Sequence, residues 1–337
     1  MSRLAVGFAF GFVLCGAVAV HAGCSGGEQA DVGINEPIQI SGSGAQFISG
    51  PLPGSPPGGG STEAEAGAAE VEGGAAVPPL SVTSVSFQNS TLISGINGTS
   101  VSGLVTTGGV SSVGVQLENQ GTGYWVVPLQ AADVQFPGQS DFGFSLSLNP
   151  GDAPGQTHLR FVAIAPDGTA GQQTNAPICI ESRVPDNGHA CAPYKKVPAA
   201  VLSLTWNTDF DVDLHVVTPD GRDVNAKTAG TTIPLDSDIV PPTVGHIDRD
   251  SIGDCVIDGW REEDLVFQDF PPSGNYLIYA APFESCGQEA VIFTLNIYAP
   301  GADGNLHSTF TRSGELLAND VTGGTSAGLF VVTKEYE

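Results

Sequence analysis

The stretch D-F-D-V-D-L-H, residues 209–215, decides the fold of the C-terminal half of this chain. In an extended strand, successive side chains point to opposite faces. One face is then apolar and carries Phe210, Val212, Leu214 and Val216, and the other carries Asp209, Asp211, Asp213 and His215. Carboxylates on one face lie about 7 Å apart and repel by about 2 kcal/mol at an effective dielectric constant of about 20. Either open water or a bound hard cation must offset this repulsion.

Short apolar or alternating runs separated by turn residues continue beyond this stretch. They predict strands at 200–206, 212–218, 275–280, 290–298, 309–316 and 328–333, with a turn at Pro219-Asp220-Gly221. We therefore expect an all-β domain over residues 199–337.

A similar pattern fills the preceding hundred residues. The predicted strands are 80–87, 91–105, 112–118, 124–129, 141–148, 158–165 and 176–180. Their spacing resembles immunoglobulin-type and fibronectin-type repeats of secreted bacterial proteins, which implies an Ig-like β-sandwich over residues 80–184. Residues 185–198 are predicted to form a hinge. Cys179, just before it, and Cys191, within it, either pair as a disulfide or join His189 at a metal site.

The N-terminus predicts export. Residues 1–23 contain a short apolar run that ends in small residues, as a secretory signal peptide does. Ala22-Gly23-Cys24 resembles the end of a bacterial lipobox, which implies that Cys24 is lipidated. Ser25 then implies transfer to the outer membrane or cell surface of a Gram-negative bacterium. The alternative is cleavage after Ala22, a free Cys24 thiol and a secreted protein.

Residues 24–79 consist mainly of Gly, Pro, Ala, Ser and Glu, with almost no large apolar side chain. Such a segment cannot offset the entropy of ordering itself, so we expect a disordered tether. A flexible chain of this length reaches about 40 Å.

The net charge of −25 argues against binding to nucleic acid and against electrostatic binding to anionic lipid. The lipid anchor is then the only expected contact with a membrane. Many of the acids lie between Asp209 and Asp269. This clustering fits either solubility or the binding of a hard cation.

The C-terminal domain also resembles a known family. The residues concerned are Leu204–Thr208, Asp211–His215, Pro219–Gly221, Cys255–Asp258, Pro271–Tyr276 and Cys286-Gly287. They are similar to the YfaP-like β-sandwich domain of bacterial lipoproteins, a domain related in appearance to pre-peptidase C-terminal domains. The resemblance implies a jelly-roll-like fold, an accessory or binding role, and a disulfide between Cys255 and Cys286.

The segment D-R-D-S-I-G-D, residues 248–254, is spaced like the front of an EF-hand loop but lacks its final Glu and its helices. Together with the acidic strand it predicts a calcium site. Its ligands would be Asp211, Asp213, Asp248 and Asp250, with Asp254, Asp258 or Glu263 in reserve. The alternative is a set of solvated acids.

No motif in the chain predicts catalysis. Gly324–Gly328 matches a nucleophile elbow in sequence, but a strand is predicted after it and no His follows. We therefore expect no enzyme, but a module for binding, adhesion or display whose partner is an extracellular protein or glycan. The alternatives are a carbohydrate-binding module that uses Trp206, Trp260 and Tyr276, and a carboxylate-dependent hydrolase.

Overall fold

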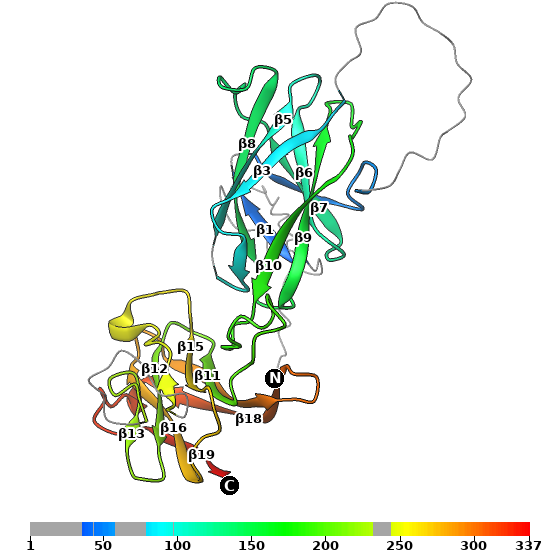
Figure 1. Ribbon diagram of the computed structural model, residues 1–337. Coiled ribbons are helices and arrows are strands. Elements are labelled where there is room, and N and C mark those ends of the chain that lie inside the picture. Colours follow the sequence, from blue (N-terminus) through cyan, green and yellow to red (C-terminus); the bar gives the residue numbers. More distant parts are fainter. Residues whose placement is uncertain (1–35, 43, 58–78, 97, 232–243) are drawn as a thin grey trace, which may run out of the picture. The chain divides into compact units, whose positions relative to one another are not determined.

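β-strands form almost all the regular structure of the described residues, which are 36–42, 44–57, 79–96, 98–231 and 244–337 of this computed structural model (Figure 1). Four sheets pack in pairs around two separate apolar cores. The predicted all-β class with two β-sandwiches is confirmed. Within the described ranges, no helix is both long and apolar enough to cross a membrane.

The first sandwich contains sheets of order β1-β8-β5-β3 and β2-β7-β6-β9-β10-β4. The first sheet consists of β1 (Ile38–Ser41), β3 (Val82–Phe87), β5 (Thr99–Thr106) and β8 (Gln139–Leu148). The second consists of β2 (Gln46–Ser49), β4 (Thr91–Ile93), β6 (Ser112–Leu117), β7 (Gly123–Pro128), β9 (Gly155–Ile164) and β10 (Thr174–Glu181).

The core of this sandwich follows from the alternation of β8, in which every second residue is buried. Phe142 and Phe144 on β8 approach Phe161 on β9, with ring centroids 6.0 and 6.5 Å apart. Because β8 and β9 belong to different sheets, these aromatic contacts join the two layers.

The sequence prediction of a tether over residues 24–79 is wrong for residues 36–42 and 44–57. Ile38 and Ile40 are buried on β1, which pairs with β8, and β2 pairs with β7. Figure 1 shows these blue strands within the first sandwich. Two four-residue strands are too short for their alternation to stand out in Gly- and Pro-rich sequence. The rest of the predicted tether, apart from Pro79, lies outside the described residues, as do Cys24 and the signal peptide.

The second sandwich contains sheets of order β14-β15-β11-β17-β18 and β13-β12-β16-β19. The first sheet consists of β11 (Ala200–Trp206), β14 (His246–Ile247), β15 (Glu262–Phe267), β17 (Ala290–Pro300) and β18 (Leu306–Leu317). The second consists of β12 (Asp211–Val217), β13 (Asp223–Val224), β16 (Gly274–Glu284) and β19 (Leu329–Tyr336).

Strand β15 is absent from the sequence prediction. Its residues E-E-D-L-V-F are all buried, and it pairs with β11 in the register Leu204↔Glu263. Three consecutive acids argue against a strand that is buried on both faces, because ionised side chains lose their hydration there. One of the central strands of this domain, β15, therefore cannot be predicted from the sequence pattern.

Both predicted disulfides are present. Cys179 on β10 bonds to Cys191 in the predicted hinge, with Cα atoms 5.7 Å apart. Cys255 bonds to Cys286, just after β16, with Cα atoms 5.4 Å apart. The second bond fastens the short 3-10 turn η1 (Gly253–Cys255), which follows the acidic loop, to the opposite sheet.

Candidate metal centre

The acidic strand β12 has the predicted two faces, but its acidic face is not open to water. Phe210, Val212, Leu214 and Val216 belong to the core. On the other face Asp211 is only 1% exposed and Asp213 only 6%. Of the two ways to offset their repulsion, open water can therefore contribute little at these two carboxylates.

The loop between β14 and β15 adds a third acid. Single carboxylate oxygens of Asp211, Asp213 and Asp250 lie within 4.8 Å of one another. Figure 1 shows the yellow segment that contains η1 beside β12. Three oxygen donors from a strand and a loop thus converge on one point, an arrangement that could hold a metal ion.

The electrostatics of this group favour the uptake of positive charge. Burial raises the pKa of Asp211 to about 7, and the neighbouring Asp213 and Asp250 contribute to the shift. Burial likewise raises the pKa of Asp213. The charged forms of Asp211 and Asp213 are therefore destabilised, and a cation bound between them would stabilise these charged forms.

Asp213 has few partners of its own. Among the described residues no hydrogen bond reaches its carboxylate, and the ring nitrogen Nε2 of His215 lies 4.0 Å from Oδ2. His215 Nδ1 lies 3.0 Å from both carboxylate oxygens of Asp223, so this ring is held by another acid. The carboxylate oxygens of Asp213 are consequently buried, accept no hydrogen bond from the described residues, and are free to act as metal ligands.

Local backbone geometry positions the loop. The backbone N–H of Asp254 donates to Oδ2 of Asp211 at 3.1 Å. A Cβ on Gly253 would lie 2.7 Å from Oδ1 of Asp250, so only glycine leaves room for this carboxylate. The Cys255–Cys286 disulfide then closes the loop immediately after these contacts.

The three acids open into a hollow of 290 Å³. Its other lining residues are Lys227, Gly253, Asp254, Val256, Asp258 and Phe283. The group is therefore reachable from outside, although two of its acids are almost fully buried.

The four predicted ligands and the reserve ligand Asp254 divide into three groups. Asp211, Asp213 and Asp250 meet, and Asp254 lines the hollow while its N–H holds Asp211. Asp248 is not part of the cluster: Oδ1 accepts the N–H of Asp264 at 3.0 Å, and Oδ2 lies 2.5 Å from the Arg249 guanidinium. The expected pairing of Asp248 with Asp250 followed the spacing of the front of an EF-hand loop, but Asp248 comes directly after β14, which ends at Ile247, and its carboxylate is held by Asp264 and Arg249 instead.

Sequence reasoning missed one residue of this region, Lys227, and did not predict the buried position of another, Glu263. Lys227 gave no signal, because a single Lys in a polar turn is an ordinary surface residue. Glu263 was only a reserve ligand, yet it is fully buried on β15 behind the three acids. Burial raises its pKa well above the ordinary value, and Asp213 adds to the effect. Only the identification of β15 as a strand could have revealed its place.

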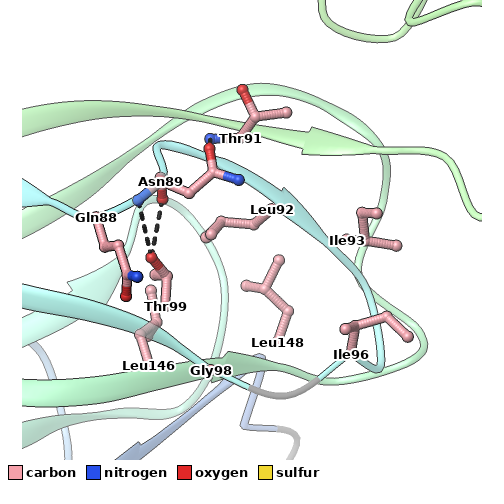
Figure 2. Close-up of a pocket in the computed structure, with 10 residues that line it drawn as sticks. All are labelled: Gln88, Asn89, Thr91, Leu92, Ile93, Ile96, Gly98, Thr99, Leu146 and Leu148. Atoms are coloured by element: carbon pink, nitrogen blue, oxygen red, sulfur yellow. Dashed lines mark hydrogen bonds between the residues drawn. The ribbon is translucent and has the colours of Figure 1, made fainter. Parts of the chain in front are cut away.

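A second hollow, of 460 Å³, lies in the first sandwich (Figure 2). Its wall includes Leu92, Leu146 and Leu148. On one side the hydroxyl of Thr99 accepts the N–H of Asn89 and donates to its carbonyl oxygen, both at 3.1 Å. None of the ten labelled residues has an ionisable side chain. This hollow therefore offers neither acid–base chemistry nor a charged ligand set.

No protein-family model matches the chain. No curated protein matches it either.

Three solved structures show limited similarity. The fibronectin(III)-like modules of CbhA from Clostridium thermocellum are 11% identical over 72% of this chain and 97% of theirs, with a TM-score of 0.19. BcpA, the major pilin subunit of Bacillus cereus, is 9% identical over 70% and 67%, with a TM-score of 0.20. SGBP-B of the Bacteroides ovatus mixed-linkage glucan utilization locus, solved with a mixed-linkage heptasaccharide, is 10% identical over 67% and 42%, with a TM-score of 0.15. At these TM-scores the similarities support no argument about function.

Proposed function

We propose that this chain is a non-catalytic, surface-exposed lipoprotein that serves in binding or display, and that its C-terminal sandwich is stabilised by calcium bound to Asp211, Asp213 and Asp250. The observation that supports the calcium site is the convergence of these three carboxylates within 4.8 Å, two of them buried. Asp213 in particular is buried without a hydrogen bond among the described residues.

The donor set fits a hard cation better than a soft one. Calcium takes about six to eight oxygen ligands, of which these carboxylates supply part, while waters and carbonyl groups supply the rest. Zinc prefers nitrogen and sulfur. Here the four described cysteines form disulfides and His215 is engaged by Asp223.

The two disulfides indicate that the protein folds in an oxidising compartment, outside the cytoplasm. The lipid on Cys24, the outer-membrane location and the YfaP-like family remain part of the proposal. Replacement of Cys24 by Ser tests the anchor: the protein should move from the membrane fraction to the soluble fraction. Retention of Cys24→Ser protein in the membrane would contradict lipid anchoring.

A sugar-binding platform receives no support from the predicted aromatic residues. Trp206 and Tyr276 are buried in the core. Trp260 has the Arg249 guanidinium 3.6 Å from its ring centroid. The elbow-like segment Gly324–Gly328 is followed by the strand β19, whereas a nucleophile elbow is followed by a helix.

Thermal unfolding of the mature protein with calcium, with magnesium or with chelator tests the metal site. A cation bound only by the native state at 100 times its Kd adds about 2.7 kcal/mol of stability. Calcium should therefore raise the Tm of the wild type, and of the control Glu289→Gln, whose side chain is exposed. Asp213→Asn should abolish the calcium response. It should also raise the Tm in chelator, because it removes one of the repelling charges.

The same Tm with calcium and with chelator in the wild type would refute the calcium site. An unchanged calcium response in Asp213→Asn would refute the assigned ligands. Screening of the calcium-loaded protein on glycan arrays would then test whether its partner is a glycan.

A further inference from the structure

Lys227 lies in the wall of the hollow that the three acids open into. It follows β13 in a tight turn, where Oδ1 of Asn225 accepts the backbone N–H groups of Lys227 at 2.9 Å and Thr228 at 3.1 Å. The hydroxyl of Thr228 donates to the carbonyl of Asp223 at 3.0 Å. These bonds fix the backbone from which the lysine side chain extends.

The ammonium group of Lys227 is held against an aromatic ring. Its Nζ lies 3.7 Å from the centroid of the Phe283 ring on β16, a cation–π contact. Gly324 leaves room for it: this residue has a φ of +74°, and a Cβ there would lie 2.9 Å from the Phe283 ring and 3.6 Å from Nζ. A side chain at position 324 would therefore disturb both the ring and the ammonium.

This positive charge acts on the acids without contacting them. Lys227 forms no ion pair with any acid in the described part of the chain; it shares the hollow with Asp211, Asp213 and Asp250. Its charge lowers the pKa of Asp213, opposing the effect of burial. The acids thus have a nearby counter-charge that leaves their oxygen atoms free.

We propose that Lys227 is the built-in counter-ion of this acidic site, stabilising it when no metal is bound and weakening its affinity for divalent cations. The second half of this statement rests on the proposed calcium site. A divalent ion at the three carboxylates would be repelled by the ammonium that the turn and Phe283 hold in the wall of the hollow. The result is a weak site suited to extracellular calcium, for which protein modules reach a Kd of about 10⁻⁴–10⁻³ M.

The test compares Lys227→Met with Lys227→Arg and with the control Lys334→Met in the full mature chain. Methionine keeps an unbranched side chain beside Phe283 and removes the charge, whereas arginine keeps the charge. Lys334 also places its ammonium near an aromatic ring, that of Tyr336, at 5.0 Å. Lys334→Met changes the net charge of the protein by the same amount as Lys227→Met, but it removes a charge that does not line the hollow. Lys227 is exposed, so the substitution should not prevent folding.

We expect two effects of Lys227→Met. In chelator at low salt its Tm should fall by about 2–4 °C relative to wild type, and this difference should shrink near 1 M salt because exposed charges are screened. Calcium titrations by calorimetry should give a Kd about tenfold lower than that of wild type. Lys227→Arg and Lys334→Met should leave both quantities close to wild type.

The two proposals fail in different ways. If wild type binds calcium and Lys227→Met changes neither the Tm in chelator nor the Kd, the counter-ion is refuted and the calcium site stands. If wild type binds no calcium but Lys227→Met still lowers the Tm in chelator, the counter-ion is supported and the calcium site is refuted. Equal effects of Lys227→Met and Lys334→Met would refute the counter-ion, because they would reflect net charge alone.

Discussion

The backbone N–H of Leu214 donates a hydrogen bond of 2.7 Å to Oε2 of Glu263, from one sheet of the second sandwich to the other. Leu214 lies on β12, whose neighbour β13 pairs only with Val216 and Val217. Because β13 is too short to reach Leu214, no backbone carbonyl of β13 accepts this N–H. The fully buried carboxylate of Glu263 on β15 is the acceptor instead. The other oxygen of Glu263 accepts the N–H of Ser251 at 3.4 Å, which ties the acidic loop to the same point.

Replacement of Glu263 should separate these roles. Glu263→Ala leaves the buried N–H of Leu214 unpaired and creates a cavity, so we expect a loss of about 2–4 kcal/mol of unfolding free energy. Glu263→Gln should cost less, because the amide fills the same space and its oxygen still accepts the N–H of Leu214, while only the longer bond from Ser251 is lost. Urea denaturation followed by tryptophan fluorescence measures both changes. Equal losses in the two variants would show that the carboxyl group is needed in its charged form.

The Cys255–Cys286 disulfide should matter both for stability and for the site. Its sequence separation of 31 residues corresponds to about 3–4 kcal/mol in the chain-entropy model. Because Cys255 directly follows Asp254, whose N–H holds Asp211, we expect the double variant Cys255→Ser, Cys286→Ser to lose stability and to bind calcium more weakly. Calorimetric calcium titration and thermal unfolding measure the two effects.

The other disulfide provides the matched control. Cys179 and Cys191, 12 residues apart in sequence, pair outside the second sandwich. The double variant Cys179→Ser, Cys191→Ser should therefore lower the Tm but keep the wild-type Kd for calcium. An unchanged Kd in both double variants would mean that the acidic loop holds its position without a covalent bond.

Much of the site could be predicted from sequence because β12 follows simple alternation. Asp211 and Asp213 are two residues apart in a strand, with the apolar Val212 between them, and the structure places them on one face as expected. Asp250 and Asp248 are also two residues apart, but they lie in a turning loop, where sequence spacing does not determine direction. The buried acids Glu262, Glu263 and Asp264 could not be predicted as a strand, because each contradicts the usual preference of charged residues for the surface.

Asp152 predicts a pH dependence in the first sandwich. Burial raises its pKa to about 6, and the N–H of Asn149, which donates to Oδ2 at 3.1 Å, only partly opposes this. The folded state then binds the proton more tightly than the unfolded state. The stabilising contribution of Asp152 should therefore be greatest near pH 4 and below, fall as the pH rises to about 6, and be absent above.

Asp152→Asn removes this titration and keeps an acceptor for the N–H of Asn149. It should raise the unfolding free energy at pH 7 by up to about 2 kcal/mol and have little effect at pH 4. Asp167→Asn is the opposite control, because the backbone N–H of Thr169 lowers the pKa of Asp167. That variant should be less stable at neutral pH, and the difference should disappear as the solution is acidified. Urea denaturation between pH 2 and 8 measures both, because the titration of Asp167 lies below pH 4. A loss of stability in Asp152→Asn at pH 7 would contradict the raised pKa.

The N-terminal strand β1 should contribute to the core of the first sandwich as strongly as the central strands do. Ile38 is 1% exposed on β1, and its carbonyl accepts the indole N–H of Trp125 at 3.0 Å. Ile38→Ala should therefore cost about 2–5 kcal/mol, the range for a buried branched side chain. Ile48→Ala on β2, where the side chain is 41% exposed, should cost less than about 1 kcal/mol.

The variants Ile38→Ala and Ile48→Ala also test whether this N-terminal segment is part of the sandwich or only a tether. If residues 36–57 only spaced the sandwich from a membrane, both substitutions would leave the urea midpoint unchanged, because no core side chain would be lost. If β1 completes the sheet beside β8, Ile38→Ala alone should shift the midpoint and expose Trp125 to solvent, which red-shifts its fluorescence. Equal midpoints for Ile38→Ala, Ile48→Ala and wild type would remove β1 from the core.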